Sequence, residues 1–127
     1  MVIPNGQFRV VFTANDYQAS VAFYRDDLGL PLDHEWDYGP GDRGTVFKAG
    51  SGLIEIFGRA PGLEVHRPQG MSLLIQVDDA DQWLKRARER QLTVVQEPVT
   101  YSWGHRILRV QDPDGIIVSL FSLVTAG

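Results

Sequence analysis

The chain carries one sequence pattern twice, and this repetition limits its possible folds more than any other feature. Residues 44–57, GTVFKAGSGLIEIF, and residues 103–121, WGHRILRVQDPDGIIVSLF, each read as two strands joined by a glycine-containing turn. A strand, an acidic helix start and an amphipathic helix precede each copy. The 127 residues therefore predict one β-α-β-β-β unit written twice, because a solenoid needs three or more repeats. A single α+β sheet with chance similarity is the alternative.

The first half predicts one helix and four strands. Asn15 or Asp16 can cap the helix, since an Asx oxygen accepts free N–H groups of the first turn. Gly29 suits the left-handed conformation that ends a helix. The apolar stripe at helical spacing consists of Tyr17, Ser20, Val21, Tyr24 and Leu28. Strands are predicted over residues 8–13, 32–38, 45–49 and 53–57.

The second half predicts the same order of elements. A strand over 71–77 leads into a helix that begins at Asp78 or Asp79. Pro98 is expected to limit a strand over 92–96. The buried stripe of the helix consists of Ala80, Trp83, Leu84 and Ala87. The turn of the final hairpin is Asp112–Pro113–Asp114–Gly115. Residues 1–127 are expected to form a single domain, with modules over about 5–60 and 70–124 and a linker over about 58–70.

Composition excludes several classes of partner. The net charge of −4 argues against nucleic-acid binding, which favours a basic stripe. No apolar run has the length of a membrane span, and the first residues lack a secretory pattern. The absence of cysteine suits a cytoplasmic protein without disulfides. We therefore expect a cytoplasmic protein that binds neither nucleic acid nor membrane.

Three motifs together carry a family resemblance. They are Asp16 with Ser20-Val21-Ala22-Phe23-Tyr24 and Leu28-Gly29-Leu30, then Leu53-Ile54-Glu55-Ile56, and finally Asp112-Pro113-Asp114-Gly115 with Ser119-Leu120. In these motifs the chain resembles the vicinal oxygen chelate superfamily of glyoxalase I, bleomycin-resistance proteins and extradiol dioxygenases. The resemblance implies an α+β fold in which two paired βαβββ modules form an open barrel-like cup. It also implies a homodimer that binds a small-molecule ligand in the cup or between chains.

The resemblance further implies four metal-ligand positions, on the first and last strand of each module. These positions hold Arg9, Glu55, Ser72 and Ser119. Only Glu55 is a good ligand, because Arg has no lone pair to give and serine hydroxyls bind transition metals poorly. We therefore expect no metal, no other cofactor and no catalytic residue of the family type.

A ligand-binding surface is predicted in place of the metal. Strand alternation puts Arg9 and Glu55 on one face, where we expect them to form an ion pair, since an unpaired buried charge is costly. The predicted ligand-binding set is Arg9, Trp36, Phe47, Glu55, Phe57, Ser72, Trp103 and Ser119. Alternatively these residues only fill a sheet face or a dimer contact. The histidines His34, His66 and His105 lack a ligand-type spacing.

The sequence favours a metal-free protein that sequesters an aromatic or peptide-like compound, as the bleomycin-resistance branch does. The negative net charge favours a neutral or cationic guest. A lyase, isomerase or dioxygenase that uses Glu55 with a metal, or Glu55 as a base, is the first alternative. A structural or regulatory module without a ligand is the second.

Overall fold

The chain divides into two compact units. The structure is a computed structural model that describes residues 2, 4–66 and 69–124. The units are Met1–His66, here unit 1, and Arg67–Gly127, here unit 2. The boundary falls within the expected linker of about 58–70, of which residues 67–68 lie outside the described part of the chain.

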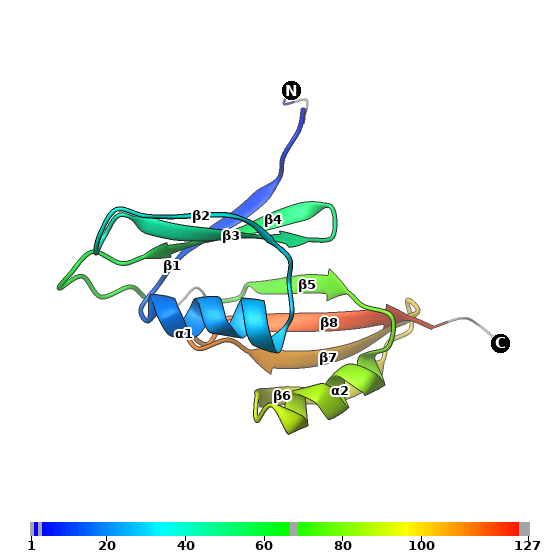
Figure 1. The fold of residues 1–127 in the computed structure, drawn as a ribbon. Coiled ribbons are helices and arrows are strands. Elements are labelled where there is room, and N and C mark those ends of the chain that lie inside the picture. Colours follow the sequence, from blue (N-terminus) through cyan, green and yellow to red (C-terminus); the bar gives the residue numbers. More distant parts are fainter. Residues whose placement is uncertain (1, 3, 67–68, 125–127) are drawn as a thin grey trace. The chain divides into compact units, whose positions relative to one another are not determined.

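Unit 1 is a four-stranded mixed sheet with one helical segment (Figure 1). Its strands run in the order β1-β4-β3-β2 across the sheet. The pairing of β1 with β4 is parallel, and the other two pairings are antiparallel. The elements are β1 (Arg9–Ala14), α1 (Tyr17–Ala22), η1 (Phe23–Asp27), β2 (Leu32–Asp37), β3 (Arg43–Ala49) and β4 (Gly52–Gly58).

Unit 2 repeats this topology, and its helix, α2, is longer than α1 (Figure 1). Its strand order, β5-β8-β7-β6, has the same sequence of one parallel and two antiparallel pairings. The elements are β5 (Ser72–Gln76), α2 (Ala80–Glu89), β6 (Thr93–Thr100), β7 (His105–Gln111) and β8 (Ile117–Leu123). The predicted α+β class and the duplicated βαβββ order are confirmed. Within the described residues, neither helix is long and apolar enough to cross a membrane.

The duplication extends to the register of the parallel strands. In unit 1, Glu55 pairs with Val11, and Arg9 lies two residues before Val11 on the same strand. In unit 2, Leu74 pairs with Ser119, which sets Ser72 at the same offset. Of the four positions implied by the family resemblance, Arg9 in unit 1 therefore corresponds to Ser72 in unit 2, and Glu55 corresponds to Ser119.

The first helix begins as predicted and ends with an irregular turn. The Asp16 carboxylate accepts the backbone N–H of Ala19 at 3.0 Å, so Asp16 is the cap. The helix then widens into a π turn, in which the Leu28 N–H reaches the Phe23 carbonyl at 2.9 Å. Phe23 and Tyr24 are both buried in this segment, and Gly29 follows with a φ of 72°. Helical spacing predicted the burial of Tyr24 but not that of Phe23.

Pro98 does not end its strand, contrary to our expectation. Strand β6 is the edge of its sheet and continues to Thr100. An edge strand tolerates proline, because the missing N–H can face away from the ladder. The register of β6 against β7 shifts twice, between Val94 and Gln96 and between Gln96 and Val99. These bulges set Gln96 opposite Arg109.

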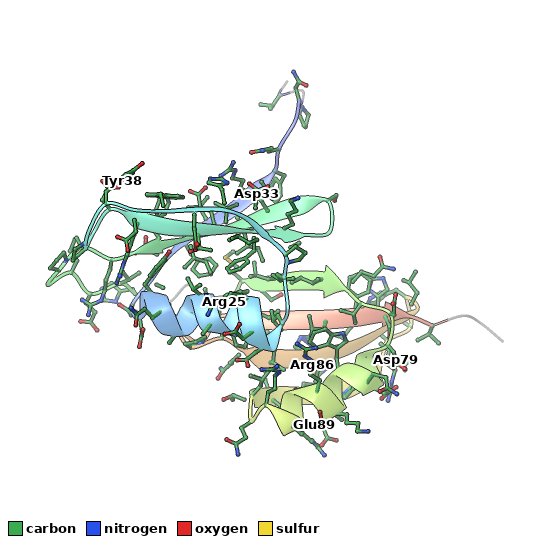
Figure 2. All side chains as sticks on the ribbon, in the orientation of Figure 1. Arg25, Asp33, Tyr38, Asp79, Arg86 and Glu89 are labelled. Carbon is green, nitrogen blue, oxygen red and sulfur yellow. The ribbon has the colours of Figure 1, made fainter. Side chains whose placement is uncertain are left out.

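The second helix and the final turn follow the sequence closely. Asp79 caps α2 through backbone N–H groups of the first turn, and its position at the helix start is visible in Figure 2. Ala80 and Ala87 are buried on the predicted stripe. In the β7–β8 turn, the buried Asp112 carboxylate accepts the N–H groups of Asp114 and Ile116, both at 2.9 Å.

Replacing Asp112 by alanine removes the acceptor of two N–H groups in this turn. A buried donor without a partner costs about 1–3 kcal/mol, so Asp112→Ala should lose about 2 kcal/mol or more of unfolding free energy. Asp112→Asn keeps an Oδ1 acceptor and should lose less than half as much. Denaturant titration measures both variants. Equal stability of the two would contradict this role of the carboxylate.

Candidate functional site

Each sheet has one face that packs against the helix of its own unit and one that does not. In unit 1 the helix side includes Phe47 and Ile56, both completely buried. Strand alternation puts Arg9, Glu55 and Phe57 on the opposite side. We call this second side the unit 1 face and its counterpart in unit 2 the unit 2 face.

The predicted ion pair between Arg9 and Glu55 is confirmed. The Arg9 Nη1 group donates to Glu55 Oε1 across the parallel pair of β1 and β4. Gln7 Oε1 accepts two further bonds from the guanidinium, from Nε at 3.0 Å and from Nη2 at 2.7 Å. The Glu55 side chain keeps only 12% of its exposure, and that of Arg9 keeps 28%. The carboxylate at this position is therefore already bound by a fixed cation.

Two aromatic residues of the predicted set meet on the unit 1 face. Trp36 contacts Phe57 edge-on, with ring centroids 5.5 Å apart. Trp36 lies opposite Gly44 in the β2–β3 pair, where the absent side chain makes room for its ring. Phe57 also borders a hollow of about 500 Å³, to which Thr13 and His66 contribute. A hollow of this volume is within the range of small-molecule sites.

Phe47 does not belong to this face, which corrects its assignment as a ligand-binding residue. Its side chain is fully buried on the helix side of the sheet, 6.4 Å from the ring of Tyr24. Alternation along β3 gives the cause, because Val46 pairs with Glu55 and its neighbour Phe47 points the other way. Phe47 is a core residue of unit 1.

A methyl group at Gly44 would collide with Trp36 and displace its ring. A Cβ at this position would lie 2.5 Å from Cζ2 of the indole, so Gly44→Ala should cost about 1–3 kcal/mol through overpacking. Gly52→Ala is the matched control, because its nearest neighbour lies 3.6 Å away and only ordinary contact results. Denaturant unfolding with tryptophan fluorescence measures both. Unchanged stability in Gly44→Ala would show that this contact does not fix Trp36.

The unit 2 face contains the other predicted residues in different environments. Ser72 is exposed, whereas Ser119 is 1% exposed and its Oγ has no hydrogen-bond partner among the described residues. Trp103 is 61% exposed and stacks on Tyr101 at 4.5 Å. His105 stacks on Phe121 at 4.2 Å, and Trp103 contacts His105 edge-on. A row of rings therefore crosses one end of this sheet.

A polar cluster that the sequence analysis did not assign lies beside these rings. Arg109 pairs with Ser119 on one side and with Gln96 on the other. Its Nη1 group donates to Gln96 Oε1 at 3.2 Å and to the Tyr101 hydroxyl at 3.3 Å. The Gln96 amide in turn donates to the same hydroxyl at 3.1 Å. The register of the final hairpin, counted back from Ser119, is the sequence signal that could have found Arg109.

This cluster shifts the ionisation of Tyr101. The hydrogen bond from Gln96, and after it the one from Arg109, lowers the pKa of the Tyr101 hydroxyl, because both favour the phenolate. Arg109, which lies opposite Ser119 in the β7–β8 pair, therefore places a positive charge beside the Tyr101 hydroxyl. Among the described residues, Arg9 donates hydrogen bonds to Gln7 and Glu55 and to no tyrosine hydroxyl.

The Tyr101 hydroxyl should ionise below the ordinary tyrosine pKa of about 10. Ultraviolet titration of the wild type minus that of Tyr101→Phe isolates this group from the other three tyrosines. Arg109→Gln should return the pKa of Tyr101 only part of the way to its ordinary value, because the hydrogen bond from Gln96 remains. Arg106→Gln should leave it unchanged, since Arg106 points to the helix side and pairs with Asp81. An unperturbed Tyr101 titration would contradict the cluster.

The four metal-ligand positions of the family do not fit a divalent transition metal here. Glu55 is bound by Arg9, which can only donate hydrogen bonds. Ser72 and Ser119 offer hydroxyl groups in place of imidazole or carboxylate. Across the described part of the chain, no three His, Cys, Asp or Glu side chains are grouped to hold a metal. We derive no chemical step through a metal.

Comparisons with known proteins agree with the fold and the motifs. The signature of the Glyoxalase/Bleomycin resistance protein/Dioxygenase superfamily matches residues 6–120, so the chain belongs to this superfamily. Uncharacterized protein YraH of Bacillus subtilis (strain 168) is 27% identical over 124 residues, which cover 87% of this chain and 92% of YraH.

Solved structures of similar fold include proteins with different names. Lactoylglutathione lyase from Agrobacterium tumefaciens has a TM-score of 0.70 at 24% identity, over 94% of this chain and 95% of that one. TioX from Micromonospora sp. ML1 has a TM-score of 0.74 at 18% identity, over 94% and 100%. At these identities the similarity shows the fold alone, and function must be argued from the residues.

Proposed function

We propose that this protein binds and sequesters a small aromatic or peptide-like compound, without a metal and without turnover. The observation that carries the proposal is the ion pair of Arg9 with Glu55. It occupies two of the positions that hold metal ligands in the metal-dependent members of the superfamily. The proposal includes a homodimer and a cytoplasmic location, as expected from the sequence.

The ion pair argues against both enzymatic uses of Glu55. A carboxylate oxygen held by a guanidinium is not free to bind a cation, and the same hydrogen bond occupies the oxygen that a general base would use. Removing Arg9 would leave the largely buried Glu55 carboxylate without this partner, which is costly. The pair of Arg9 and Glu55 presents N–H groups and a carboxylate side by side. It is thus suited to orient the polar end of a guest.

The aromatic residues supply the second part of the argument. Trp36 and Phe57 on unit 1, and Trp103 with Tyr101 on unit 2, present rings at the faces without a helix. Binding sites for small molecules combine such apolar surface with a few placed polar groups. A flat guest gains contact on a ring without disturbing the sheet beneath it.

Tryptophan fluorescence tests the proposal against a panel of neutral, cationic and anionic aromatic compounds and short peptides. We expect saturable quenching by members of the panel, reduced at least severalfold in affinity by Trp103→Phe or Trp36→Phe. Trp83→Phe is the control, because Trp83 lies on α2 with Arg86 above its ring at 4.9 Å. Its substitution should leave affinity unchanged.

Two results would overturn the proposal. Silence of the whole panel would favour a module without a ligand. Turnover of a bound compound that requires an added divalent cation would identify a lyase, isomerase or dioxygenase instead. Light scattering of the purified chain tests the homodimer separately, and a monomer at the concentrations of the binding assay would exclude it.

A further inference from the structure

We propose that Arg109 anchors the carboxylate of a planar aromatic ligand whose ring stacks beside Trp103 on the unit 2 face. The inference rests on the proposed function, which it makes more specific. It also differs from the expectation from net charge, which favoured a neutral or cationic guest. The proposed site lies within unit 2.

Arg109 differs in its partners from the arginines that form ion pairs. Arg9, Arg88 and Arg106 each form an ion pair with a carboxylate. The partners of Arg109 are the neutral Gln96 and Tyr101, and no described residue forms an ion pair with it. A half-buried cation gains most from a negative partner, because neutral groups offset only part of its lost hydration. A ligand carboxylate is the partner that this position lacks.

The geometry leaves the guanidinium able to bind in bidentate fashion. Both hydrogen bonds of Arg109 to described residues come from Nη1. The N–H groups of Nη2 and Nε therefore remain for a ligand, and a planar carboxylate matches such a fork. Gln96 and Tyr101 hold the guanidinium in place from one side, which reduces the entropy lost on binding.

Ser119 provides a second, independent observation at the same point. It lies directly opposite Arg109 in the β7–β8 pair, where side chains are about 5 Å apart. Its hydroxyl is buried and has no hydrogen-bond partner among the described residues. Most buried polar groups in proteins are satisfied. An anionic oxygen bound by Arg109 would also give this hydroxyl an acceptor.

The neighbouring rings define the rest of the ligand. Tyr101 links the two regions, since its hydroxyl accepts from Arg109 while its ring stacks on Trp103 at an interplanar angle of 21°. The exposed Trp103 thus offers a flat surface next to the Tyr101 ring, whose centroid lies 5.8 Å from the Arg109 guanidinium carbon. The lowered pKa of Tyr101 is consistent with a positive potential here. Together these features select a flat ring that bears a carboxylate.

Calorimetry with 2-naphthoate and its neutral analogue 2-naphthamide tests the inference. The wild type should bind the acid about tenfold more tightly than the amide, because charge-assisted hydrogen bonds are stronger than neutral ones. Arg109→Gln should remove this preference while binding of the amide persists. Arg109→Lys should keep part of it, since lysine retains the charge but not the fork.

The control is Arg106→Gln, which removes one positive charge from the same strand on the opposite face. It should leave the preference for the acid intact, and circular dichroism checks that each variant is folded. Equal affinity for acid and amide in the wild type, with no effect of Arg109→Gln, would overturn the carboxylate anchor and leave the proposed function standing. Failure of both probes to bind at millimolar concentration would overturn the anchor; the wider fluorescence panel decides the proposed function.

Discussion

The parallel pairing of the first and last strand of each unit is the constraint from which both candidate faces follow. Parallel neighbours cannot be joined by a tight turn, so the chain must cross over, and a helix forms within each crossover. That helix covers one face of its own sheet. The other face then receives alternate residues of all four strands, including the pair Arg9 and Glu55 and the pair Ser72 and Ser119.

The two units use this shared framework differently. In unit 1 the cation lies on the first strand and is neutralised by Glu55, while Val46 pairs with that glutamate. In unit 2 the position equivalent to Val46 is Arg109, and the residue opposite it is Ser119. At these equivalent positions, unit 1 therefore contains an ion pair, whereas Arg109 in unit 2 has no carboxylate partner among the described residues. Duplication explains the common register, and divergence at a few positions explains the different chemistry.

The element order could be predicted from the sequence because helix caps, glycine turns and apolar periodicity act locally. Asp16, Asp79 and the turn at Asp112 are examples in which a side chain bonds its own nearby backbone. The ion pair of Arg9 and Glu55 could also be predicted from the sequence. Strand alternation and the family register put the two side chains on one face, and each buried charge needs a partner.

Features that depend on neighbouring strands could not be predicted in the same way. Pro98 is tolerated because β6 is an edge, which the local sequence does not reveal. Phe47 was assigned from its proximity to a loop, although the alternation of β3 directs it into the core. The hairpin register could have indicated Arg109, but the partner Gln96 could not be predicted, because the bulges of β6 set it opposite Arg109.

Elemental analysis of the protein tests the proposal that Glu55, because Arg9 binds it, holds no functional metal. The chain would be purified without chelators and its content of first-row divalent metals measured by mass spectrometry. If Arg9 holds Glu55 as proposed, every metal should be present at far less than one ion per chain, in the wild type and in Glu55→Gln alike. One tightly held ion per wild-type chain, lost in Glu55→Gln, would contradict it.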